Sequence, residues 1–489
     1  MTGLRRAKGL AEGLGLDSLL GRRDLLRVGA ISIAGSALPA LLGQPAALQA
    51  AAKREPSEAQ GEAKSVIFLW MSGGVTHIDS FDPKPDAPVE VRGTLGDIAT
   101  SVPGIRFCET LPKLAAMADQ LAVLRSFSHD SDDHLLSQVY TLSGRRIDRT
   151  QLFSEPNIGG IVWRLQGARA GLPGYIAVPG ITRPGPPPHN LFVGGWLGSK
   201  FAPYCLGGLP AQPDFTVGEK RFDPPAALEE DLQPKSLTLA PEIPLARLSS
   251  RRQLRDSFDQ ALRALDRSDT LQAAESQYQN ALRLLTTPAV RDAFAVGDEP
   301  ASTREAYGRT KIGGRCLTAR RLVEAGARFV MVDYGYDPDY GNIWDNHNVA
   351  VQNHPPLQQM VYRGYHLAGI DRAFSALIRD LDERGLLATT LVCFITEFGR
   401  TPQLNKNGGR DHWGKAGSLF FTGGGIKTGQ VVGETDRTGA RPITHPYGPW
   451  DVAATIYQQL GISPKSFVHD FQDRPRPLLE EGEVIRELV

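Results

Sequence analysis

Short, almost entirely apolar runs alternate along this 489-residue chain with longer stretches of helical periodicity. The runs predict strands buried on both faces, and the periodic stretches predict helices. The predicted strands are SVIFLW (65–70), LAVLRS (121–126), GYIAVP (174–179), RFVMVDYG (328–335), TLVCFITE (390–397) and SLFFTGG (418–424). The predicted helices cover residues 111–118, 134–142, 158–166, 311–325, 362–385 and 450–460. Buried strands that alternate with helices indicate a mainly parallel sheet covered on both faces.

Two regions depart from this alternation. Residues 182–244 are rich in proline and glycine, and TRPGPPPHN fits neither a helix interior nor a central strand, so we predict loops there. Residues 245–300 contain two amphipathic patterns, which predict a helical insertion with apolar stripes that serve packing. We therefore predict a single α/β domain over residues 65–489 that carries both regions.

The first fifty residues have a different pattern. GRRDLLR (21–27) precedes an apolar run of small residues (28–42), and AALQAAA follows it. This order predicts a twin-arginine export signal over residues 1–52, followed by a disordered junction over residues 53–64. The apolar run is short for a bilayer span of about 20 residues. We therefore expect export to the periplasm or cell surface, and membrane attachment only if the signal stays uncleaved.

Composition narrows the choice of partners. Positive and negative side chains balance at 54 each, so no basic excess favours nucleic acid, and we expect no nucleic-acid partner. The four cysteines are scattered without a CxxC pair, which excludes a zinc-finger framework.

Histidine and acidic side chains cluster after four of the predicted strands. The clusters include His77 and Asp79, then His134, then Asp345 and His347, and finally Glu397, Arg400, Asp411 and His412. Because the carboxyl ends of parallel strands meet at one edge of a sheet, we expect these side chains to lie close together. Imidazole and carboxylate ligands suit zinc, manganese or iron, and such metals activate water or polarise an ester oxygen.

Each cluster also fits a purely structural role. Acidic residues at 130–133 could cap the helix that follows them. Glu397 could pair with Arg400, since a buried carboxylate requires a partner. Residues 337–348 begin like a calcium loop, although Asn348 stands where the final glutamate is expected.

Five segments resemble the exported bacterial family called domain of unknown function 1501. They are VIFLWMSGGVTHIDSFDPKP (66–85), CLTARRLVEAGARFVMV (316–332), WDNHN (344–348), ITEFGRTP (395–402) and GRDHWGK (409–415). The resemblance covers nearly the whole chain after the signal. It places the chain in the alkaline phosphatase and sulfatase superfamily and implies a three-layer α/β/α sandwich.

The same resemblance indicates a remodelled site. Ser72 and Gly73 stand where sulfatases have two aspartates, and counting back from LSGR (142–145) puts His134 at the place of the nucleophile. Phe398 replaces a metal ligand after Glu397. Three residues resemble the remaining ligand set, and three others could be recruited as new ligands. The first three are Asp345, His347 and His412, and the others are His77, Asp79 and His134.

Two hypotheses follow. The first is a hydrolase of sulfate or phosphate esters, for example on polysaccharides, that depends on a divalent metal such as zinc, manganese or calcium. In this reading Glu397 or Asp411 lies near the metal, His134 acts as general acid/base or nucleophile, and Arg400 neutralises the anionic group. The second is a non-catalytic sulfatase-like fold that binds an extracellular glycan or a partner protein.

Overall fold

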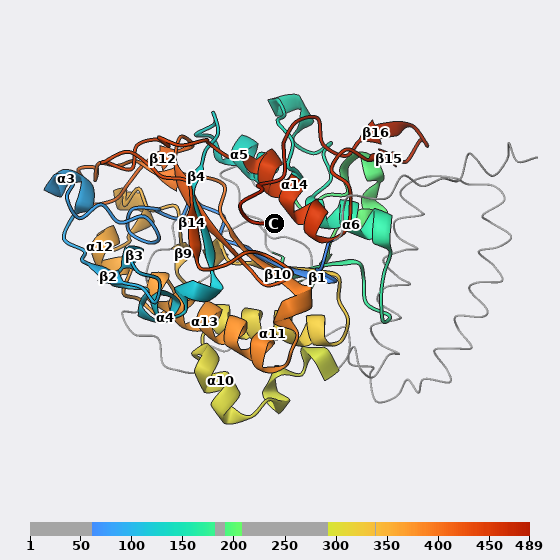
Figure 1. Cartoon of the computed structure of the whole chain (residues 1–489), viewed down its shortest axis with the longest axis horizontal. Coiled ribbons are helices and arrows are strands. Elements are labelled where there is room, and N and C mark those ends of the chain that lie inside the picture. Colours follow the sequence, from blue (N-terminus) through green and yellow to red (C-terminus); the bar gives the residue numbers. More distant parts are fainter. Residues whose placement is uncertain (1–60, 181–190, 208–291, 338) are drawn as a thin grey trace, which may run out of the picture. The chain divides into compact units, whose positions relative to one another are not determined.

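The computed structural model describes residues 61–180, 191–207, 292–337 and 339–489 (Figure 1). The predicted export signal, residues 53–60 of the junction, most of the proline-rich region and most of the helical insertion lie outside these residues. Residues 61–64 were predicted to belong to the disordered junction, yet Ala63 is buried and its backbone N–H donates to the Gln459 carbonyl at 2.9 Å. Residues 61–64 are therefore not part of a disordered junction.

An eight-stranded sheet lies at the centre of the described part of the chain (Figure 1). Its strands, in spatial order, are β14 (Gln430–Val432), β4 (Ala122–Phe127), β13 (Gly417–Thr422), β10 (Thr390–Ile395), β1 (Ser65–Trp70), β7 (Phe329–Asp333), β5 (Tyr175–Val178) and β6 (Tyr204–Cys205). Only β13 runs antiparallel to its neighbours β10 and β4. The prediction of a mainly parallel sheet is confirmed.

Helices cover both faces of this sheet. The helices are α4 (Pro112–Ala116), α10 (Ala301–Tyr307), α11 (Lys311–Glu324) and α13 (Leu367–Glu383) on one face, and α5 (His134–Ser143), α6 (Ile158–Gln166) and α14 (Pro449–Gln459) on the other. Ile67 and Leu69 of β1 pack with the first group, and Val66 and Phe68 pack with the second. Successive strand residues point to opposite faces, so an unbroken apolar run serves two cores. This arrangement is the predicted three-layer α/β/α sandwich.

Short elements decorate the sandwich. They are the helices α3 (Val89–Arg92) and α12 (Leu357–Met360), and the ribbons β2 (Asp97–Ala99) with β3 (Arg106–Cys108), β8 (Tyr336–Asp337) with β9 (Gly341–Asn342), β11 (Gly399–Arg400) with β12 (His412–Trp413), and β15 (Phe467–His469) with β16 (Pro475–Pro477). Helix α13 begins at Leu367 and not at Tyr362, because Gly364 lies in a turn before it. All four cysteines are free. None of the helices within the described ranges has the length and apolar character of a membrane span.

Strand direction decides which loops meet. Strands β1, β4, β7 and β10 are parallel in the sheet, so their carboxyl ends share one edge. Because β13 runs the other way, the residues that precede it reach this same edge. The ribbon β11–β12 joins the two sides there, pairing Arg400 with His412. The edge therefore collects side chains from segments more than 250 residues apart in sequence.

Candidate metal centre

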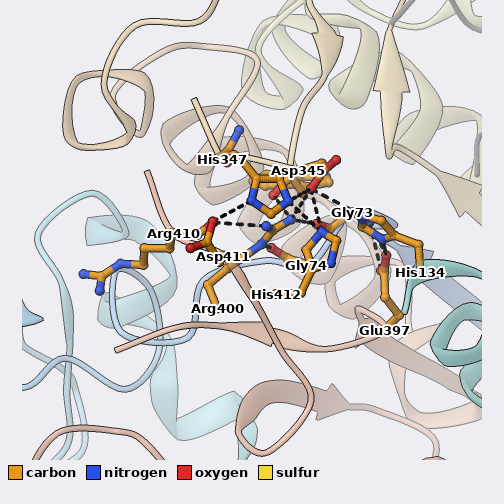
Figure 2. Close-up of polar contacts among 12 residues, drawn as sticks. Gly73, Gly74, His134, Asp345, His347, Glu397, Arg400, Arg410, Asp411 and His412 are labelled. Atoms are coloured by element: carbon orange, nitrogen blue, oxygen red, sulfur yellow. Dashed lines mark hydrogen bonds and ion pairs between the residues drawn. The ribbon is translucent and has the colours of Figure 1, made fainter. Parts of the chain in front are cut away.

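Four segments bring a compact polar cluster to this edge (Figure 2). His134 is the first residue of α5, a helix capped by the Asp133 side chain, which accepts from Leu136 N–H at 3.0 Å. Glu397 follows β10 directly, Asp345 lies in the loop after β9, and His412 lies in β12. Strand ends and a helix start thus position the cluster.

The donor atoms of three residues converge. The ligand atoms of His134, Asp345 and His412 all lie within 4.8 Å of one another. Asp345 Oδ1 lies 3.2 Å from His134 Nε2 and 3.1 Å from His412 Nε2. Two imidazoles and one carboxylate are a ligand set of catalytic zinc sites, which keep a further position open for water or substrate.

The second nitrogen of each imidazole is held by an oxygen. His134 Nδ1 lies 2.9 Å from Glu397 Oε1, and His412 Nδ1 lies 2.9 Å from the Asp132 carbonyl. An oxygen acceptor at Nδ1 favours a proton on that nitrogen, so the Nε2 lone pair is available to a metal when the ring is neutral. Metal-binding histidines are oriented in this way by carboxylates and carbonyls.

The spacing of these atoms fits a metal ion. Ligand atoms around a tetrahedral zinc lie about 3.3–3.6 Å apart, given bonds of about 2.0–2.2 Å. The measured separations of 3.1 and 3.2 Å are close to this range. Burial lowers the pKa of His412 to about 4, so this ring is neutral at pH 7.

His347 reaches the same converging atoms from the exposed side of the cluster. Its Nε2 lies 2.8 Å from His412 Nε2 and 3.1 Å from Asp345 Oδ1, and its Nδ1 lies 2.8 Å from Asp411 Oδ1. Its side chain is 24% exposed and that of Asp411 is 56% exposed. The carboxylate–imidazole pair therefore faces solvent at the rim of the cluster, and it is the part that an incoming molecule can reach.

Glu397 is the most deeply buried carboxylate of the cluster, with its side chain 0% exposed. Its carboxylate accepts the Gly73 N–H through both oxygens, at 2.7 and 2.9 Å, and Gln138 Nε2 at 3.1 Å, besides its contact with His134. Burial by itself would raise the pKa of Glu397, but the hydrogen bond and charge of His134 lower it overall. Conversely, burial would lower the pKa of His134, and Asp345 and Glu397 together raise it.

The alternative in which Glu397 pairs with Arg400 is not what the structure shows, because each residue has a different partner. Arg400 donates from Nη2 to Asp345 Oδ1 at 2.8 Å, and its side chain is 1% exposed. The remaining hydrogen bonds of this guanidinium go to backbone carbonyls. It is therefore enclosed by the protein and orients Asp345, a geometry that does not favour the predicted contact with a substrate anion.

Two other candidate ligands are engaged elsewhere. Asp79 forms a buried ion pair with Arg410, at 2.7 and 3.0 Å, and His77 Nε2 lies 2.8 Å from the Gly439 carbonyl. Neither residue belongs to the converging group, so the structure does not recruit them. In the calcium-like loop, Asp337 and Asp339 both form ion pairs with Lys311, so a lysine ammonium stands where a cation was considered.

Some members of the cluster were not predicted. Gln138 lies four residues after His134 on α5, and this spacing places both side chains on one helix face, a signal that the sequence contained. The Gly73 N–H and the Asp132 carbonyl are backbone groups, and no residue type marks them in advance. Phe398 packs against both imidazoles, with ring centroids 5.1 Å from His134 and 4.9 Å from His412.

Comparison with known proteins identifies the family. The chain belongs to the family described as "Protein of unknown function (DUF1501)", whose model matches residues 63–489. No curated protein matches it in sequence.

Several solved structures resemble the chain weakly. Ps i-CgsB, solved in complex with k-i-k-neocarrahexaose, is 11% identical, with a TM-score of 0.37. The match covers 82% of this chain and 72% of that chain. The lipoteichoic acid synthase LtaP from Listeria monocytogenes is 9% identical at 0.33, with 83% of this chain and 74% of that chain covered. The phosphonate monoester hydrolase SpPMH from Silicibacter pomeroyi is 11% identical at 0.35, with 86% and 76% covered. These scores carry no conclusion about activity.

Proposed function

We propose that the chain is a metal-dependent hydrolase of sulfate or phosphate esters, with its metal held by His134, Asp345 and His412. The observation that carries the proposal is the convergence of two imidazole Nε2 atoms on Asp345 Oδ1, with both Nδ1 atoms already held by oxygens. A divalent zinc or manganese ion bound there supplies a Lewis acid that polarises an ester oxygen and lowers the pKa of water.

His134 takes a different role from the one expected for it. The carboxylate that holds His134 Nδ1 is the fully buried Glu397, and Nε2 faces Asp345, so a proton taken up by His134 has no direct path to solvent. The residue therefore serves as a ligand. Glu397 orients it and is too enclosed to exchange protons with a substrate.

The proton acceptor is the pair His347–Asp411. The Asp411 carboxylate holds the Nδ1 proton of His347 at 2.8 Å, so the Nε2 lone pair points towards His412 and Asp345. An imidazole oriented by a carboxylate in this way is suited to take a proton from water at the open side of the cluster. Its exposed position gives it access to the attacking water and to the leaving group.

The substrate class rests on the sequence. The motifs that resemble sulfatases support an anionic ester, and the export signal predicted over residues 1–52 supports a substrate outside the cytoplasm, such as a sulfated or phosphorylated polysaccharide. Binding of such a glycan without hydrolysis is the competing outcome of the experiment below.

The test is to purify the exported protein, measure its metal content, and assay aryl sulfate, aryl phosphate and phosphonate esters with and without a chelator. His412→Ala should lose metal and activity together, whereas His347→Ala should keep its metal and lose activity by about 10²-fold or more, the usual contribution of a proton acceptor. His445→Ala, which replaces an exposed histidine outside the cluster, is the control and should keep both metal and activity. Protein that contains metal and binds a sulfated glycan, yet hydrolyses none of these esters, would contradict the enzyme and support a binding protein.

A further inference from the structure

The guanidinium of Arg400 occupies an oxygen-lined position next to the candidate metal centre. Its nitrogens contact the carbonyl oxygens of Gly74 (2.9 Å), Trp344 (3.0 Å), Arg410 (3.1 Å) and Gly73, and Asp345 Oδ1 (2.8 Å). Four carbonyls and one carboxylate are the kind of oxygen set that binds a hard cation. In this chain the position is filled by a side chain.

One nitrogen shows how oxygen-rich the position is. Arg400 Nη2 contacts three oxygens, those of Gly73, Trp344 and Asp345. A guanidinium Nη has two hydrogens, so the oxygens outnumber the hydrogens available to them. A spherical cation would satisfy all three, which indicates that the surroundings select positive charge rather than hydrogen-bond direction.

The position shares a ligand with the metal centre. Asp345 Oδ1 faces Arg400 on one side and the imidazoles of His134 and His412 on the other. In two-metal sites the ions lie about 3.5–4 Å apart and are commonly bridged by such a carboxylate. From this geometry, and resting on the proposed function, we infer that Arg400 is a built-in cation that fills a second cation position and limits the centre to one metal ion.

Close packing fixes the guanidinium in this place. A Cβ added at Gly74, whose φ is +85°, would lie 3.0 Å from Arg400 Nε and 2.4 Å from Phe398 Cε2. The Phe398 ring lies 5.7 Å from the guanidinium carbon. The glycine after β1 thus lets the backbone approach Arg400 and Phe398 closely, and the guanidinium is enclosed, with its side chain 1% exposed.

The test counts ions in the exported full-length protein. Wild type, loaded with Co²⁺ and offered Ca²⁺, should bind one Co²⁺ per chain and no Ca²⁺. Arg400→Ser removes the guanidinium and should bind one Co²⁺ and one Ca²⁺, with Ca²⁺ shifting the visible Co²⁺ spectrum because Asp345 is shared. Arg410→Ser is the matched control: that arginine is equally buried but pairs with Asp79, so Ca²⁺ should leave the Co²⁺ spectrum of this variant unchanged.

The outcomes separate the two proposals. Wild type with two ions per chain, or a folded Arg400→Ser that binds no Ca²⁺, would overturn the built-in cation and leave the metal centre standing. Wild type with no Co²⁺ would overturn the metal centre itself. If Arg400→Ser does not fold, Arg400→Lys is measured in its place. This variant keeps the positive charge, so it should bind one Co²⁺ and no Ca²⁺. Binding of a second ion would refute the inference.

Discussion

Glu397→Gln is the sharpest test of how the cluster is organised. The substitution keeps the shape of the side chain but replaces one acceptor oxygen by an NH₂ group and removes the charge. The Gly73 N–H, His134 Nδ1 and Gln138 Nε2 all contact Oε1, and the Gly73 N–H also contacts Oε2 at 2.9 Å. If the amide oxygen takes the place of Oε1, the new NH₂ group faces the Gly73 N–H, donor against donor, and three donors are left on one neutral oxygen in place of a carboxylate.

The magnitude follows from these contacts. A hydrogen bond to a charged group contributes about 1.5–3 kcal/mol, so we expect the free energy of unfolding to fall by about 2–3 kcal/mol. His134 also loses its carboxylate partner, and loss of such a partner typically weakens metal binding by about 10–100-fold. Stability is measured by denaturant unfolding of the metal-free protein, and zinc affinity by competition with a chromophoric chelator.

Glu155→Gln is the matched control. Glu155 is also buried and pairs with Arg145 at 2.9 Å, but it contacts Trp196 and no member of the cluster. It should lose comparable stability and keep wild-type zinc affinity. A Glu397→Gln variant that binds zinc as tightly as wild type would refute a specific role of Glu397 in orienting His134. An equal loss of zinc affinity in Glu397→Gln and Glu155→Gln would refute it as well.

Three further predictions follow from the same geometry. Gly74→Ala places a Cβ at φ +85° and against Phe398, so strain and overpacking should lower the free energy of unfolding by about 3 kcal/mol. Gly104→Ala is the control, since Gly104 has φ +82° but open space, and the strain alone should cost about 1–2 kcal/mol. Equal costs in thermal unfolding would refute the contribution of overpacking. Burial lowers the pKa of His366 to about 3, so its folded form resists protonation while the unfolded form binds a proton below about pH 6.5. Stability from this residue is lost as pH falls from 6.5 towards 3, amounting to about 2 kcal/mol at pH 5, and His366→Asn should show that much less acid destabilisation between pH 7 and 5. Chelation should lower the melting temperature, and zinc at about 1,000 times its Kd should restore about 4 kcal/mol; an identical melting curve with and without chelator would contradict the metal site.

Much of the fold could be predicted because its signals are local. The run SVIFLW coincides with β1, and Ile158–Gln166 coincides with α6. A fully buried strand needs apolar residues on both faces, so its sequence is unmistakable once flanked by helical periodicity. The short ribbons and β14 were missed, since three-residue strands carry too little pattern to separate from loops.

The sequence by itself determined the layers of the sandwich and the edge of the sheet that carries the cluster. It could place Asp345 and His412 among the candidate ligands, because both follow predicted strand ends and because their motifs resemble the ligand set of the superfamily. Only the tertiary structure decided the partners: Glu397 meets His134, Arg400 meets Asp345, and Asp79 meets Arg410. The physical reason is that these pairs join residues far apart in sequence, so the local pattern around each residue does not specify its partner.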